Sequence, residues 1–162
     1  MKGSQKVIDL LNRQLTLELS SMDQYLAHSK LYEDWGVNKL HAQLVHEYEE
    51  ELGHAQGIIE RILFLEGEAD TASRQPIKIG KNVKEILEND LEAEVTVAES
   101  LREIIAVCET ENDYVTRDML KQLLEDTEMD HIYWLERALG LIDRIGIHNY
   151  IQSQMQGDAP GA

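Results

Sequence analysis

The sequence predicts an all-α protein, built as a four-helix bundle with a long crossover between helices two and three and a short fifth helix at the C-terminus. Only two of the 162 residues are proline, and neither interrupts a long periodic segment. Four segments repeat apolar residues at three- and four-residue spacing, which is the period of an amphipathic helix. The second and third segments are joined by a stretch rich in Thr, Ser, Pro and Gly, which is long enough to cross the length of a bundle.

Helix boundaries follow from capping residues and breakers. The expected helices cover residues 4–32 (ending near Gly36), 38–66, 82–111, 113–139 or beyond, and 147–154, with a loop at 68–81. Ser4 and Asn82 are expected N-caps, and Glu85 completes a capping box with Asn82. Gly67 should stop the second helix. The chain therefore divides into a bundle at 1–146, a short helix at 147–155 and a flexible tail at 156–162.

The charge balance excludes some partners. Asp and Glu total 31 against 15 Lys and Arg, a net charge of −16, so nucleic acid is a poor partner and cations are favoured ones. No apolar run has membrane-spanning length, and the N-terminus lacks the apolar stretch of a signal peptide, so we expect a cytoplasmic protein. The single Cys108 excludes an intrachain disulfide and a cysteine-based metal site.

Ionisable residues interrupt the apolar stripe near the middle of every long helix. A buried carboxylate without a partner costs several kcal/mol, so acids at core positions are normally paired, protonated or bound to metal. The second stripe also contains Glu47. The candidate ligands, one or two from each helix, are Glu18, Glu51, His54, Glu94, Glu128 and His131.

Two of the helices carry the motif Glu-x-x-His, once at Glu51 and His54 and once at Glu128 and His131. Residues at i and i+3 project from the same side of an α-helix, so each pair can bind one metal ion. One Glu from each of two helices with Glu-x-x-His from the other two is the known ligand pattern of ferritin-like di-iron and di-manganese proteins, and the sequence is matched here to that pattern.

The expected roles follow from this pattern. Glu51 and Glu128 would bridge two ions, Glu18 and Glu94 would be terminal ligands, and each histidine would bind one ion. Mixed carboxylate and imidazole ligands suit iron, and they also suit zinc or manganese. Tyr25, on the same stripe as Glu18, is either a nearby hydrogen-bond or electron donor or a tyrosine that packs in the core.

Nearly the whole chain resembles bacterioferritin. The resemblance is carried by residues 1–3 (MKG), 59–67 (IERILFLEG), 113–119 (DYVTRDM), 134–136 (WLE) and 149–150 (NY). It places the ferroxidase ligands of that family on the same six residues: Glu18, Glu51, His54, Glu94, Glu128 and His131. It also implies a 24-subunit cage with pores lined by the fifth helix, where Asn149 and Gln152 lie. Iron would be oxidised by dioxygen or peroxide, stored as ferric mineral and released through a small ferredoxin.

Two further implications concern the second helix. His46 and Glu50 occupy the positions at which relatives bind an iron on the inner surface of the cage, although the family more often has Asp at the second of them. Many bacterioferritins place a Met after the bridging Glu, where two subunits sandwich a haem b; this chain has Leu52, which has no donor atom. The chain then forms either a haem-free homo-oligomer or a mixed cage with a haem-binding sister subunit.

Two alternatives remain open on the sequence. A rubrerythrin-like peroxidase also uses Glu-x-x-His pairs in a helical bundle, but it usually carries a cysteine-ligated iron domain that one Cys cannot make. An acidic helical scaffold without catalytic activity would have no requirement for the six core residues.

Overall fold

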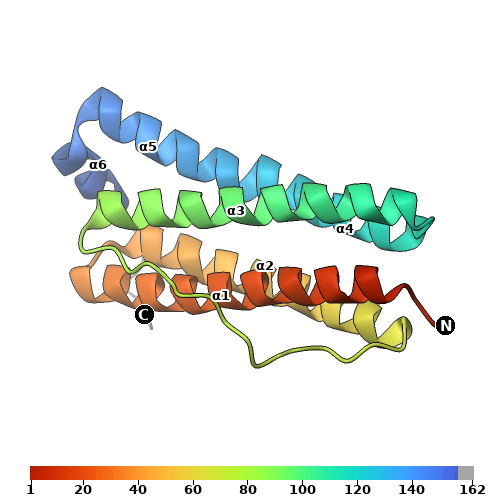
Figure 1. Ribbon diagram of the computed structural model, residues 1–162. Coiled ribbons are helices and arrows are strands. Elements are labelled where there is room, and N and C mark those ends of the chain that lie inside the picture. The colour runs from red at the N-terminus through yellow and green to blue at the C-terminus, as the bar shows by residue number, and fades with distance from the viewer. Residues whose placement is uncertain (157–162) are drawn as a thin grey trace.

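The computed structural model describes residues 1–156, and all regular secondary structure in that range is helical (Figure 1). The elements are α1 (Gln5–Trp35), α2 (Asn38–Phe64), α3 (Val83–Thr110), α4 (Tyr114–Asp126), the π-helical turn η1 (Thr127–Ile132), α5 (Tyr133–Ile145) and α6 (Ile147–Gln154). α4, η1 and α5 follow one another without a break and form the fourth long helix. α1 packs along α2 and α3 along α4, which confirms the predicted four-helix bundle with a short fifth helix. Apart from Gln156, the expected tail lies outside the described residues.

The helix ends show how the bundle is closed. α1 ends at Gly36, whose φ of 75° lets the Val37 amide donate to the Tyr32 carbonyl at 2.9 Å. α2 ends two residues earlier than expected, because the left-handed residue there is Glu66 and not Gly67. Asn82 caps α3 by accepting from the Glu85 amide at 3.0 Å, as predicted. Ser4 precedes α1 in an extended conformation, but its side chain makes no capping hydrogen bond.

The crossover runs along the bundle from the end of α2 to the start of α3 (Figure 1). A buried network of hydrogen bonds holds the end of the crossover, at Gly80, against α1 and α3. The Gly80 amide donates to His28 Nε2 at 3.0 Å, so the ring proton is on Nδ1, which donates to Asp90 Oδ1 at 2.8 Å. Gln24 donates to the same Asp90 oxygen at 2.8 Å. Gly80 lies so close to the Ile86 backbone that a Cβ would come within 2.5 Å of its nitrogen, so a larger residue does not fit there.

The core consists of two apolar clusters. One contains Leu11, Ile58 and Leu101; the other contains Tyr32, Leu40 and Leu87, and each has further members from all four long helices. On α2, α3 and the fourth long helix, the ionisable residues of the stripes fall between the residues of one cluster and those of the other. On α1, Glu18 lies near the end of the first cluster, between Leu17 and Met22. The bundle therefore has a buried polar band between two apolar halves. In the described range, no helix is both long and apolar enough to cross a membrane.

The turn η1 is the main departure from the expected helices. A π turn accommodates one additional residue, so it shifts the register of everything on one side relative to the other. Thr127 and His131 are both fully buried, and the Thr127 hydroxyl donates to the Leu123 carbonyl at 2.9 Å. Glu128 consequently does not share a face with His131, because the α-helical i, i+3 relation does not hold across this turn.

Candidate metal centre

Side chains from α1, α2, α3 and η1 meet in the polar band. Two groups of three, Glu18–Glu51–His54 and Glu51–Glu94–His131, each have donor atoms within 4.8 Å of one another. The four residues other than His54 are fully buried, and His54 is 8% exposed. Glu51 belongs to both groups, so the two candidate cation positions are adjacent.

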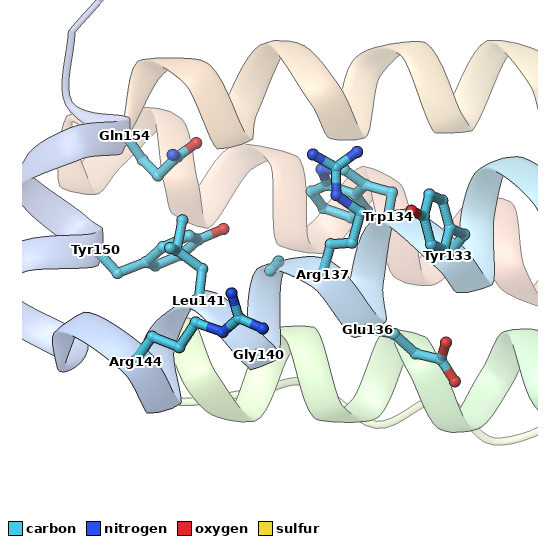
Figure 2. Close-up of a pocket in the computed structure, with 10 residues that line it drawn as sticks. Tyr133, Trp134, Glu136, Arg137, Gly140, Leu141, Arg144, Tyr150 and Gln154 are labelled. Carbon is cyan, nitrogen blue, oxygen red and sulfur yellow. The ribbon is translucent and has the colours of Figure 1, made fainter.

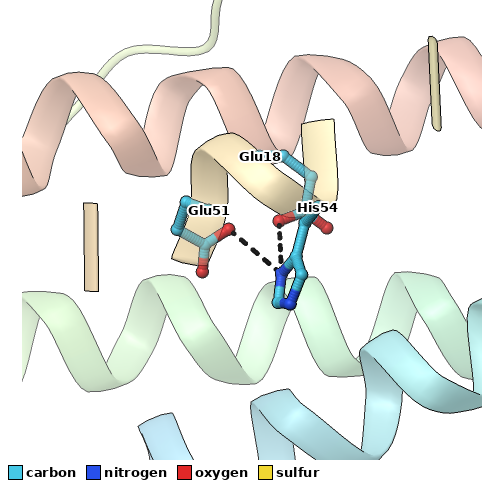
Figure 3. Close-up of side chains that lie close together, drawn as sticks. All are labelled: Glu18, Glu51 and His54. Carbon is cyan, nitrogen blue, oxygen red and sulfur yellow. Dashed lines mark ion pairs between the residues drawn. The ribbon is translucent and has the colours of Figure 1, made fainter. Parts of the chain in front are cut away.

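The first group lies between α1 and α2 (Figure 3). His54 Nδ1 is 3.7 Å from Glu18 Oε2 and 3.6 Å from Glu51 Oε2. Gln14 donates to the other Glu18 oxygen at 2.7 Å, which orients the carboxylate. Asp126 Oδ2 lies 3.5 Å from His54 Nε2, on the side of the ring away from the group. A carboxylate behind a histidine is the usual arrangement for orienting a metal ligand.

The second group connects α2, α3 and η1. His131 Nδ1 is 3.0 Å from Glu51 Oε1 and 3.3 Å from Glu94 Oε1, and the Tyr25 hydroxyl donates to Glu94. The His54 and His131 rings lie 5.8 Å apart in a stacked arrangement. Each oxygen of Glu51 therefore faces a different histidine, which is the geometry of a carboxylate that bridges two ions.

Several polar atoms in these groups are buried without a hydrogen-bond partner among the described residues. They include one oxygen each of Glu18 and Glu94, both oxygens of Glu51, and the Nδ1 atoms of His54 and His131. Buried polar atoms in folded proteins are nearly always paired. All of these orphaned atoms can ligate a cation, so the donor set fits a pair of divalent metal ions.

The pKa values of the buried acids and histidines are shifted so that the cluster is stable without bound cations. Burial raises the pKa of Glu51, and the charges of Glu18 and Glu94 raise it further. Burial lowers the pKa of His54, but the neighbouring carboxylates of Glu18 and Glu51 outweigh this and raise it to about 10. The pKa of His131 is likewise raised by Glu51 and Glu94 against the effect of burial. Both histidines therefore carry protons in the cation-free protein, and a bound divalent ion would displace them.

The pKa of Glu18 is lowered, whereas that of Glu51 is raised. Burial acts to raise its pKa, but the nearby Glu51 and His54 side chains and the hydrogen bond from Gln14 outweigh burial and lower it to about 2. This carboxylate is therefore ionised at neutral pH and available to a cation.

The structure brings together five of the six predicted ligands. The sixth, Glu128, is 40% exposed and pairs with Arg102 at 2.6 Å on the outside of the helix. The π-helical turn accounts for this placement, because it rotates Glu128 away from the buried face that carries His131. Nothing in the sequence marks the turn, since it contains neither Gly nor Pro.

The remaining candidates lie as follows. Tyr25 is buried against Glu94, and His46 lies 3.1 Å from Glu50 nearer the surface. Leu52 is 39% exposed on α2 and takes no part in either group. In α6, the Asn149 side chain donates to a backbone carbonyl at 2.7 Å and Gln152 is exposed.

Glu47 is the residue that the ligand prediction missed. It is fully buried, and its Oε2 lies 3.1 Å from His131 Nε2. Its place on the second apolar stripe, one turn before Glu51, was a usable signal. The motif Glu-x-x-His does not include it.

A separate surface hollow of about 650 Å³ lies between α5 and α6 (Figure 2). Tyr133, Trp134, Arg137, Leu141 and Tyr150 are among the side chains around it. None of the residues that line it belongs to the two groups described above. The hollow is therefore separate from the candidate metal centre.

A four-helix bundle with a long crossover and buried Glu and His side chains on its axis defines the ferritin-like class of helical proteins. The family model described as "Ferritin-like domain" matches residues 8–145, and the chain belongs to this family.

Three relatives with the names bacterial ferritin or bacterioferritin are similar to nearly the whole chain. The chain is 50% identical over 155 residues to "Bacterial ferritin" of Synechocystis sp., covering 96% of this chain and 99% of that protein. It is 52% identical over 157 residues to "Bacterial ferritin" of Pseudomonas aeruginosa, covering 96% and 100%. "Bacterioferritin" of Brucella melitensis is 41% identical over 152 residues, covering 94% of both chains.

Proposed function

We propose that this protein is an iron-storage subunit whose buried centre oxidises Fe(II) to Fe(III). The observation that carries the proposal is Glu51, whose two oxygens face different histidines in two adjacent groups of buried, unpartnered donors. The names of the relatives, bacterial ferritin and bacterioferritin, support iron as the metal.

Iron is the substrate in this proposal. Glu18 and His54 bind one ferrous ion, Glu94 and His131 bind the other, and Glu51 bridges them. Three donors for each ion leave coordination positions open, which the oxidant needs. Two ferrous ions give up one electron each, and dioxygen takes two electrons and two protons to become hydrogen peroxide. With hydrogen peroxide as oxidant, the same two electrons and two protons yield two water molecules.

Residues next to the ligands orient the carboxylates of the centre by hydrogen bonds. The Gln14 amide holds one oxygen of Glu18, so that the other oxygen faces His54. The Tyr25 hydroxyl donates to the same Glu94 oxygen that lies 3.3 Å from His131 Nδ1, which orients this carboxylate towards the second group. The protons on His54 and His131 leave when the ferrous ions bind.

The proposal differs from the sequence prediction at Glu128. The Arg102 ion pair and the π-helical turn hold this side chain outside the centre, so the proposed centre has five protein ligands. Glu47 and Glu50 lie on the side of His131 away from Glu51 and supply negative charge there.

The assembly is part of the same proposal. We expect a cage of 24 subunits in the cytoplasm, with α6 at its pores and ferric mineral inside. The hollow beside α6 exposes Tyr133 and Leu141, apolar surface suited to contact with a second copy of the chain. Leu52 gives a haem-free cage, or a mixed cage in which a sister subunit supplies methionine to haem b. A small ferredoxin would reduce the stored iron for release.

Ferrous oxidation kinetics test the proposed activity. Ferrous iron is added in air to the cation-free protein, to Glu51→Gln and to Glu49→Gln, which makes the same charge change at an exposed position two residues away. We expect Glu51→Gln to oxidise iron about 100-fold more slowly or worse, since even residues that only hydrogen-bond to ligands contribute 10–100-fold. Glu49→Gln should match the wild type. Equal rates in all three proteins would overturn the proposal.

A further inference from the structure

Asp90 is a fully buried carboxylate that belongs to neither of the two ligand groups. It lies on α3 one turn before Glu94, and residues at i and i+4 share a face of a helix. Its Oδ1 atom accepts hydrogen bonds from Gln24 Nε2 and from His28 Nδ1, each at 2.8 Å. Its Oδ2 atom is buried without a hydrogen-bond partner among the described residues. The two oxygens therefore differ, and Oδ2 is the one that is free to carry a proton.

The contacts of Asp90 bring no positive charge to it. His28 Nε2 accepts from the Gly80 amide at 3.0 Å, and a ring nitrogen that accepts a hydrogen bond carries no proton. The imidazole is therefore neutral, although it is the only side chain in residues 1–156 within ion-pair distance of Asp90. The amide of Gln24 is neutral as well. Both side chains that donate to Asp90 are thus uncharged.

A buried carboxylate without a counter-charge favours its protonated form. Burial raises the pKa of Asp90 and the charge of Glu94 adds to this, although the hydrogen bonds that Asp90 accepts act in the opposite direction. The other titratable side chains that its charge reaches are Tyr25 and Tyr32. Burial raises the pKa values of both hydroxyls and the charge of Asp90 raises them further, so both tyrosines stay neutral.

Divalent ions at the centre would reverse this balance. Glu94 is a ligand in the proposed function, and an ion bound to it cancels its charge and adds positive charge on the same side of α3. Side chains at i and i+4 are about 6 Å apart. At that distance, and with an effective dielectric constant of about 20, each unit of charge changes a protonation equilibrium about 100-fold. Bound ions therefore strongly favour the ionised form of Asp90.

We propose that Asp90 is a proton store coupled to the metal centre, whose Oδ2 atom carries a proton in the cation-free protein and releases it when divalent ions bind. The inference rests on the proposed function only for the position of those ions. On release, the O–H bond at Oδ2 breaks, its electron pair stays on the carboxylate, and the proton leaves to water. The proton becomes available as the ferrous ions arrive, and dioxygen takes up two protons when it is reduced.

Proton release on zinc binding tests the proposal, because zinc is not oxidised and no proton is consumed by dioxygen. Zinc is added to saturation to the wild type, to Asp90→Asn and to Glu88→Gln in weakly buffered solution at mildly acidic pH, and the released protons are counted by back-titration. We expect Asp90→Asn to release about one proton per subunit fewer than the wild type. Glu88→Gln, the same charge change at an exposed position two residues away on α3, should match the wild type.

Two results of this experiment would be decisive against the account. Equal proton release by the wild type and Asp90→Asn would overturn the proton store. Wild-type protein that binds no pair of zinc ions would overturn the proposed function instead.

The cation-free protein gives a second measurement. An Asn side chain resembles a protonated Asp90, because its oxygen can accept from Gln24 and His28 while its NH2 group replaces Oδ2. Asp90→Asn should therefore melt close to the wild type, and its infrared spectrum should lose part of the band of protonated carboxyl groups that zinc removes from the wild type. A marked fall in melting temperature would show that the ionised form is required. That result, or an equal infrared band in both proteins, would overturn the proposal.

Discussion

Deleting Thr127 should convert the π-helical turn into α-helix and bring Glu128 into the centre. The deletion removes the additional residue, so α4 and α5 can keep their packing while they join as one α-helix. Glu128 then takes the buried position of Thr127, three residues before His131, where i, i+3 spacing directs it towards the same side.

The size of the effect can be worked from three contributions. The Arg102–Glu128 ion pair is lost, and because its side chains are 54% and 40% exposed this costs at most about 1 kcal/mol. The buried Thr127 hydrogen bond to Leu123 contributes about 1 kcal/mol. A carboxylate buried without a counter-ion beside Glu51 costs about 3 kcal/mol. The cation-free deletion variant should therefore be less stable than the wild type by about 5 kcal/mol.

Unfolding with a chelator and with zinc, which is not oxidised, provides the assay. With zinc bound, Glu128 becomes a ligand, the third contribution disappears, and the deficit should shrink to about 2 kcal/mol. Adding Glu128→Gln to the deletion keeps the register and removes the charge, so it should restore about 3 kcal/mol without the metal. Thr127→Ala isolates the hydroxyl contribution. If the deletion costs the same with and without zinc, Glu128 does not enter the centre and the account of the π turn is refuted.

Other predictions concern protons and haem. The pKa of His54 is about 10 in the folded protein against 6.5 unfolded, so the native state binds more protons between these values and cation-free stability should fall as pH rises through this window. His54→Asn should flatten that slope in thermal unfolding; an equally steep slope would contradict protonation of His54. Because cations must displace these protons, cobalt affinity measured by equilibrium dialysis should rise with pH over the same window. Leu52→Met should allow haem to bind between two copies, seen as a Soret band at one haem per two chains, and its absence in an assembled cage would contradict the role assigned to Leu52.

The sequence predicted the bundle well because helix formation depends on local patterns. Three- and four-residue spacing of apolar residues, few prolines and the Asn82–Glu85 capping box all act within a few residues of chain. The same spacing placed Glu18, Glu51, His54 and Glu94 on inward faces, because an uninterrupted α-helix fixes the direction of each side chain.

The π-helical turn could not be predicted in this way. The motif Glu128-x-x-His131 fits an α-helix well, and only packing of both flanking helices in the bundle determines which of its residues faces inward. His131 kept its predicted position and Glu128 did not, because the additional residue is absorbed before His131. Contacts of His131 with Glu47 and Glu50 depend on the distance between two helices, which a pattern along one helix does not contain.

A stepwise ferrous titration of the cation-free protein in air tests the paired centre most directly. Small additions of iron are followed by the absorbance of the rapidly formed ferric product. Two groups that share Glu51 predict a sharp break at two ferrous ions per subunit, followed by slower mineral growth, and Glu51→Gln should abolish the break. A break at one ion per subunit, or rapid oxidation without any break, would contradict a centre that binds and oxidises iron in pairs.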